Sequence, residues 1–142
     1  NETYNGLKFV VHQNELLVKL KDENSSYKNT GDLVRISGDR VLFDGRISGS
    51  ANIGGVKINP EFVETLMRNH EDVFEAKVWV KKNSFSGNIL MAEIVVNKSV
   101  DSDWMINFRR YLKDSSQKES VPAIIELVES IKFSSSGKLS RF

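Results

Sequence analysis

One glycine-rich stretch, from Gly45 to Glu64, constrains the fold of this chain more than any other segment. Its sequence, GRISGSANIGGVKINPEFVE, holds four glycines and then an Asn-Pro pair that opens an apolar helical pattern. Glycine is used where the backbone must take a positive φ or approach another group closely. The stretch is therefore expected to bend, to move or to lie against a ligand, although an ordinary hairpin with a glycine turn would need the same residues.

The composition restricts the chain to ordinary globular classes. Its 142 residues are 39% hydrophobic and 27% charged, which suits one domain or a small domain with a fragment of another. The net charge of +1 argues against general electrostatic binding to nucleic acid or to anionic lipid. The absence of cysteine and the presence of only two histidines argue against a thiolate or histidine metal site. No apolar run is long enough to span a membrane and no signal peptide opens the chain, so we expect a cytoplasmic protein.

The first 45 residues predict only short strands. They are expected at Leu7–Val11, Glu15–Leu20, Leu33–Ile36 and Arg40–Phe43, with polar turns between them. Asp32 would lie just where the third strand begins, next to a glycine, where a carboxylate can bind a diol or a cation or can simply stabilise the turn. This region is too small to hold a core, so we interpret residues 1–45 as a β-strand remnant of a larger upstream domain.

Residues 46–142 predict a compact α+β domain. Asn59 and Pro60 open one helix that ends near Asn69, and Asp101 caps a second helix with its aromatic residues on one core-facing side. Strands are expected at Val73–Val80, Asn88–Val96 and Ala123–Ile131, a polar loop at Lys113–Ser120 and a flexible tail at Ser134–Arg141. The two helices would cover one face of a small three-stranded sheet, with a β-hairpin before them.

Common site motifs do not account for the glycines. Gly137-Lys138 is not a P-loop, because Lys132 stands where that motif needs glycine and Leu139 stands where it needs Ser or Thr. The glycines at 49 and 54 do not have the spacing of a dinucleotide fingerprint. The sequence also contains no nucleophile elbow and no zinc signature.

A set of short motifs remains, and their order is informative. They are Thr30-Gly31-Asp32, Gly45-Arg46, Gly54-Gly55-x-Lys57, Pro60-x-x-Val63-Glu64 and Ser136-Gly137-Lys138-x-x-Arg141. In this order and at these intervals, over about positions 15 to 142, they resemble the C-terminal part of the AMP-forming adenylating enzymes. That superfamily includes acyl-CoA synthetases, the adenylation domains of peptide synthetases, and luciferases. Its ligases activate a carboxylate with ATP as an acyl-adenylate and then pass the acyl group to a thiol.

The resemblance implies a nucleotide site and a catalytic lysine. Asp32 matches the aspartate that accepts hydrogen bonds from the two ribose hydroxyls of ATP, and Arg46 matches an arginine that also contacts the nucleotide. Lys57 matches a basic position near the phosphates. Lys138 matches the catalytic lysine that bridges the carboxylate substrate and the α-phosphate, where a cation stabilises the negative charge that builds up.

The resemblance also implies a domain that rotates between the two half-reactions. Gly54 and Gly55 would line the tunnel for the pantetheine arm of the thiol substrate, and Ser48 with Gly49 would form the hinge. Two departures blur the subfamily, because the family usually has Asp or Lys where Ser48 stands, and many members have lysine where Asn52 stands.

The expected function is the C-terminal portion of an acyl-CoA synthetase that uses ATP and CoA. Mg²⁺ would be bound largely by an upstream N-terminal domain, which would also select the carboxylic acid. Without that domain, we expect the chain to be inactive. Two alternatives stay open: an adenylation domain that loads the pantetheine of a carrier protein, and a noncatalytic α+β binding module. The first uses the same residues, and the second would lack a phosphate loop upstream.

Overall fold

The described residues form a five-stranded sheet and a three-stranded sheet, with a two-stranded hairpin between them in the chain. The computed structural model describes residues 2–4, 6–21, 24–85 and 87–132. Its strands are β1 (Glu2–Tyr4), β2 (Leu7–His12), β3 (Glu15–Leu20), β4 (Lys28–Ser37), β5 (Arg40–Arg46), β6 (Ala51–Ile53), β7 (Val56–Ile58), β8 (Val73–Asn83), β9 (Gly87–Val96) and β10 (Ile124–Leu127). Its helices are α1 (Pro60–Arg68), α2 (Ser102–Ser115) and the 3₁₀ helix η1 (Lys118–Ser120). The described helices are all too short or too polar to cross a membrane.

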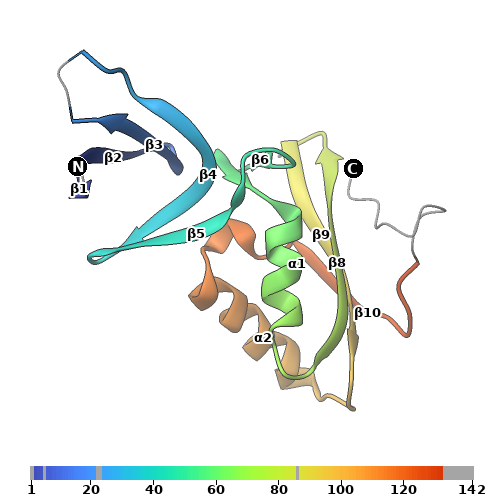
Figure 1. The fold of residues 1–142 in the computed structure, drawn as a ribbon. Coiled ribbons are helices and arrows are strands. Elements are labelled where there is room, and N and C mark those ends of the chain that lie inside the picture. The colour runs from blue at the N-terminus through green and yellow to red at the C-terminus, as the bar shows by residue number, and fades with distance from the viewer. Residues whose placement is uncertain (1, 5, 22–23, 86, 133–142) are drawn as a thin grey trace.

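The upstream part is an antiparallel sheet of five strands in the order β1-β2-β3-β4-β5 (Figure 1). Its predicted first hairpin is confirmed, because His12 pairs with Glu15 across a two-residue turn. Both turn residues, Gln13 and Asn14, have positive φ (50° and 57°), which matches the twist of tight hairpins.

The third predicted strand was wrong at its start. β4 begins at Lys28, so Asp32 lies inside the strand and not where it begins. The polar sequence before Leu33 reads as a loop, but β4 runs through it because β3 supplies cross-strand partners for Lys28 and Asn29. Gly31, with φ +84°, and a shift of register after Asp32 accommodate the irregularity.

The downstream part has the predicted α+β architecture. Its sheet has the order β10-β9-β8, with β9 central, antiparallel to β8 and parallel to β10. Figure 1 shows α1 and α2 on the same side of this sheet. The Asn59 side chain caps α1 by accepting from the backbone N–H groups of Glu61 and Phe62, as predicted.

The two helices supply the core side chains that the sequence pattern predicted. Val63 and Met67 of α1 and Phe108 and Leu112 of α2 are buried in one cluster with residues of the sheet. Trp104 packs on this cluster and stacks on Phe108 with ring centroids 4.8 Å apart. The aromatic face of α2 therefore belongs to the core.

Two boundaries near the end of the chain differ from the prediction. α2 continues to Ser115 and η1 follows it, where a polar loop at Lys113–Ser120 was predicted. β10 covers only Ile124–Leu127 of the predicted Ala123–Ile131, since its pairing with β9 stops at Ile94.

Candidate functional site

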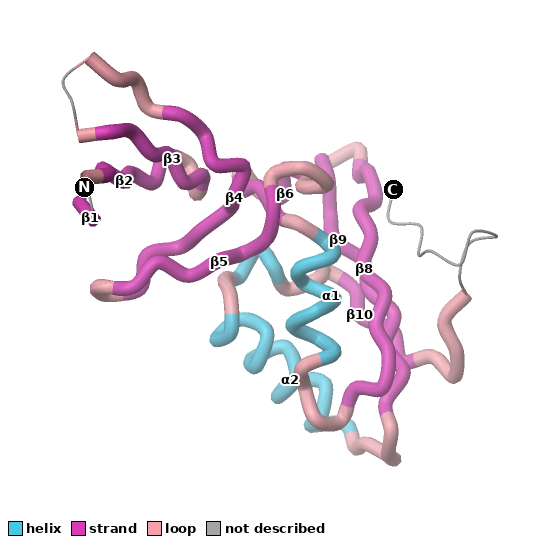
Figure 2. The backbone as a smooth tube through the Cα atoms, in the orientation of Figure 1, coloured by secondary structure: helices cyan, strands magenta, loops and turns pink. Residues whose placement is uncertain are grey.

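The β6–β7 hairpin carries the predicted glycine pair at its turn. Gly54 and Gly55 have φ of +56° and +85°, as two-residue hairpin turns of the primed type require. A Cβ added at Gly55 would meet no atom within 4 Å, and one at Gly54 would meet only Cγ of Glu119 at 3.8 Å. The glycines are thus needed for the turn, and the space beside Gly55 is open. Figure 2 shows β6 between the two sheets.

Asp32 and Arg46, the two residues that the resemblance assigns to the nucleotide, lie side by side. They are cross-strand partners in β4 and β5, and Nη1 of Arg46 lies 2.5 Å from Oδ1 of Asp32. The same nitrogen donates to the carbonyl of Thr30 at 3.2 Å. The pair is accessible, since 29% of the Asp32 side chain and 57% of the Arg46 side chain are exposed.

Gly31 makes this arrangement possible. A Cβ at Gly31 would lie 2.5 Å from Nη2 of Arg46, so the guanidinium occupies the place of a side chain. The carbonyl of Arg46 is in turn held at 2.9 Å by the Asn59 side-chain amide. Neither role was assigned from the sequence, although the glycine before Asp32 and the capping asparagine were both visible there.

Lys57 lies on β7 and is bound to the upstream sheet. Its ammonium pairs with Oε1 of Glu15, and its carbonyl accepts a hydrogen bond from the Asn14 side chain at 3.0 Å. Asn29 donates to the second oxygen of Glu15 at 2.6 Å. The hydrogen bond from Lys57, with that from Asn29, holds the pKa of Glu15 below its usual value. In the described part of the chain, Lys57 forms no hydrogen bond or ion pair with Asp32 or Arg46.

A groove of about 440 Å³ runs beside this contact. It is lined by Gln13, Asn14, Asn52, Gly55, Val56, Lys57 and Gln117. Apart from Gly55 and Val56 the lining residues are polar, and the buried Nε2 of Gln117 has no hydrogen-bond partner among the described residues. The groove therefore offers amide donors, which suit a ligand with carbonyl or anionic oxygens, while its one cation, Lys57, is paired with Glu15.

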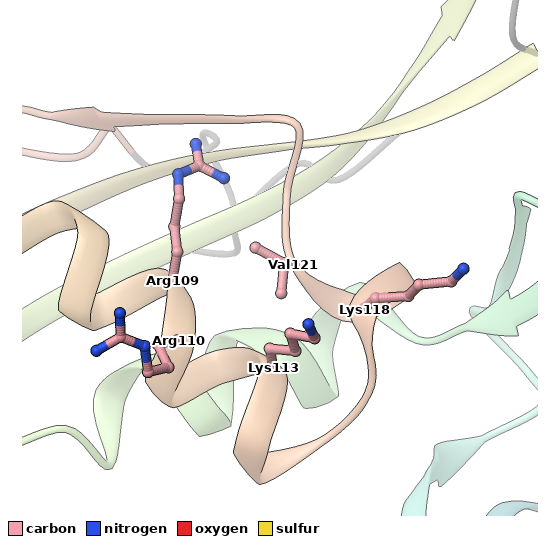
Figure 3. A pocket seen from close by; sticks show the side chains of 5 residues that line it. All are labelled: Arg109, Arg110, Lys113, Lys118 and Val121. Carbon is pink, nitrogen blue, oxygen red and sulfur yellow. The ribbon is translucent and has the colours of Figure 1, made fainter.

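A second hollow, of about 340 Å³, is basic. It is lined by Arg109, Arg110, Lys113, Lys118 and Val121, which come from α2, η1 and the segment after it (Figure 3). Arg109 is already engaged, since it donates to the carbonyls of Pro122 and Ala123 at 2.8 and 3.4 Å. The cations suit an anionic group. Sequence analysis missed this hollow, because its residues span a predicted loop.

The predicted hinge residues form an exposed turn. Ser48 and Gly49 lie between Ile47 and Ser50, whose backbone N–H donates to the Ile47 carbonyl at 2.9 Å. Gly49 has φ +84°, and a Cβ there would meet nothing within 4 Å. Lys138, the predicted catalytic lysine, lies outside the described residues. The described residues contain no group of three or more acidic or histidine side chains that could hold a metal.

Comparisons with known proteins find similar chains among curated proteins and among solved structures. No protein-family model matches the chain. It is similar to a long chain fatty acid-CoA ligase of Staphylococcus haemolyticus, with 28% identity over 116 residues that cover 82% of the chain and 24% of the relative. It is also similar to a 3,4-dihydroxybenzoate–[aryl-carrier protein] ligase of Bacillus anthracis, with 30% identity over 128 residues that cover 89% of the chain and 29% of the relative.

Among solved structures, the amide bond synthetase McbA of Marinactinospora thermotolerans has the same fold. The TM-score is 0.61 at 19% identity, over 96% of this chain and 33% of that structure. The chain therefore spans about a third or less of the length of each of these proteins.

Proposed function

We infer that this chain is the C-terminal portion of an AMP-forming acid–thiol ligase of the adenylating enzyme superfamily. The relatives and structural neighbours are acyl-CoA ligases, carrier-protein ligases and adenylation enzymes, which agrees with the resemblance found in the sequence. The observation that carries the proposal is the pairing of Asp32 with Arg46 over Gly31. These are the residues that the resemblance assigns to the nucleotide.

We propose that the whole enzyme catalyses two steps. A carboxylate oxygen attacks the α-phosphorus of ATP, pyrophosphate leaves, and an acyl-adenylate forms. The thiol sulfur of CoA then loses its proton and attacks the acyl carbon, and AMP leaves. Mg²⁺ and most of the ATP-binding groups belong, in this proposal, to an upstream domain, which also selects the acid. We also propose a cytoplasmic location.

The described residues fit the roles proposed for them. Asp32 is partly exposed and, in the described chain, only its Oδ1 has a partner, so Oδ2 can accept from a ribose hydroxyl. Arg46 is more than half exposed and has further N–H donors for the nucleotide. Lys57 is proposed to meet phosphate oxygens after it leaves Glu15. Lys138 is proposed to stabilise the charge that develops at the α-phosphate.

The groove and the basic hollow support an anionic thiol substrate such as CoA. The thin pantetheine arm fits beside Gly55, where no side chain intrudes. The two sites are linked through the chain, since Gln117 lines the groove and the next residue, Lys118, lines the hollow. Phosphates of CoA would find cations there. The alternative acceptor is the pantetheine of a carrier protein, which would use the same groove.

The two proposed half-reactions require residues 46–142 to move relative to residues 1–45. Residues 1–45 would stay with the upstream domain, while residues 46–142 would rotate about Ser48 and Gly49. Hinges are formed by a few residues at the ends of elements, and this exposed turn between β5 and β6 has that position.

The proposal is tested in the full-length enzyme with Lys138→Ala. Adenylation, measured as pyrophosphate exchange, should fall by about 10²–10³, the effect of removing one charge-stabilising group. Thioester formation from preformed adenylate should be largely spared. The exposed Lys82 gives the matched control Lys82→Ala, which should leave both rates unchanged. Equal losses in both half-reactions would refute the role of Lys138, and no exchange by the wild type with any acid would favour a noncatalytic module.

A further inference from the structure

Arg35 links the two parts of the molecule through a contact that does not involve the proposed hinge residues Ser48 and Gly49. It lies on β4, and its Nη1 and Nη2 donate to the carbonyls of Ser116 and Ser115 at 2.9 and 3.2 Å. Its Nε donates to Oδ2 of Asp44 at 2.6 Å. One side chain of the upstream sheet thus binds the C-terminal end of α2.

The chemistry of this contact is favourable and directional. The last carbonyls of a helix have no partner within the helix, and the helix dipole makes that end negative. A guanidinium supplies several donors in a rigid fork, so it can bind two carbonyls and a carboxylate together. Only 21% of the Arg35 side chain is exposed, which limits screening by solvent.

Burial of the Asp44 carboxylate costs free energy, which a role in stability alone does not explain. Its side chain is 5% exposed, and its Oδ1 has no hydrogen-bond partner among the described residues. Buried ion pairs contribute little net stability, and an unsatisfied buried oxygen is unfavourable. Asp44 does, however, fix the direction of the Arg35 guanidinium toward α2. The pair is better explained by positioning than by stabilisation.

We propose that Arg35, aimed by Asp44, is a clasp that holds residues 46–142 in one orientation against residues 1–45. The clasp rests on the proposed function, since it acts on the rotation about Ser48 and Gly49. Rotation would part Arg35 from the end of α2, because the two lie on opposite sides of the hinge. In the clasped orientation Glu15 occupies the ammonium of Lys57, which withholds that lysine from anionic ligands. Arg35 is thus a positioning residue that regulates access to the site.

The test measures orientation in this chain directly. The sequence has no cysteine, so Asp39→Cys and Ser102→Cys, both at exposed positions, give one label in each part. Spin labels there report the distance distribution between β4–β5 and α2 by pulsed electron resonance. Arg35→Gln should raise the ratio of displaced to clasped molecules at least about tenfold, as expected for loss of charge-assisted hydrogen bonds.

The matched control is Arg109→Gln. Arg109 also binds two backbone carbonyls, those of Pro122 and Ala123, but within the downstream part. This control should lower the melting temperature without moving the distance. An unchanged distribution in folded Arg35→Gln would overturn the clasp. If Arg35→Gln does not fold, Arg35→Lys and Asp44→Asn take its place, and unchanged distances in both would overturn it equally.

The outcome is independent of catalysis. A displaced population in Arg35→Gln together with an inactive full-length protein would support the clasp and refute the ligase. Activity of the full-length enzyme together with an unchanged distance distribution in Arg35→Gln would support the ligase and overturn the clasp.

Discussion

The two sheets of this molecule differ in how completely they bury their own apolar side chains. The downstream sheet and its helices share one core, in which Val63, Met67 and Ile94 are 0% exposed. In the described part of the upstream sheet, the buried hydrophobic residues are Leu33 and Val34. Its β4–β5 ribbon exposes large apolar side chains at Ile36 (65%), Val41 (47%) and Phe43 (53%).

This difference indicates which part of the chain can fold independently. Ile36 and Val41 are cross-strand partners and form an apolar pair that this chain leaves exposed. A small sheet needs one face packed on a core or on helices to be independently stable. The downstream part meets this condition, and the upstream sheet meets it poorly. This agrees with the proposal that the upstream sheet belongs to a larger domain.

The strongest test of this comparison removes a large side chain from each sheet. Phe108→Ala should lower the free energy of unfolding by about 3–5 kcal/mol, because it leaves a cavity in the shared core. Ile36→Ala should change it by no more than about 0.5 kcal/mol, because that side chain is already exposed. Urea denaturation followed by circular dichroism measures both. Similar losses would show that the upstream sheet has a core after all.

A smaller effect is expected where the two parts meet. Gly45 has φ +108°, and a Cβ there would lie 2.9 Å from Cβ of Asn59 and 3.0 Å from Cβ of Phe62. Gly45→Ala should therefore cost about 2–3 kcal/mol of stability, from backbone strain and crowding together. Gly55→Ala is the matched control, with a positive φ but open space, and should cost about 1 kcal/mol. Thermal unfolding that ranks the two in the reverse order would contradict the close approach of α1 and β5.

The smallest effect is pH-dependent and lies in the downstream part. The hydrogen bond from Nε1 of Trp104 to Asp72, at 2.9 Å, together with Lys98, lowers the pKa of Asp72. A carboxylate with a lowered folded-state pKa stabilises the protein above its unfolded pKa and loses that contribution as the pH falls through the folded value. Asp72→Asn should thus be less stable than wild type at pH 7, and the gap should close on acidification. A gap that widens at low pH would contradict this sign.

Local signals predicted the downstream fold well. The cap at Asn59, the proline after it and the apolar spacing of α1 all lie within one short segment, so sequence was sufficient. The end of α2 was not predictable, because its last carbonyls are satisfied by Arg35, some 80 residues earlier in the chain. For the same reason the contact of Lys57 could not be predicted. Asp32 and Arg46 were expected at one nucleotide, but the partner of Lys57 is Glu15, 42 residues away.

The guanidinium of Arg46 rests where Gly31 has no side chain, and this has a consequence for inheritance. Any other residue at position 31 carries two costs, because its Cβ would displace that guanidinium and because φ +84° strains L residues whatever the space around them. Loss of arginine at position 46 would relieve only the first cost. A smaller residue at 46 leaves Gly31 undisturbed, so position 31 should be the more restricted of the two in related sequences.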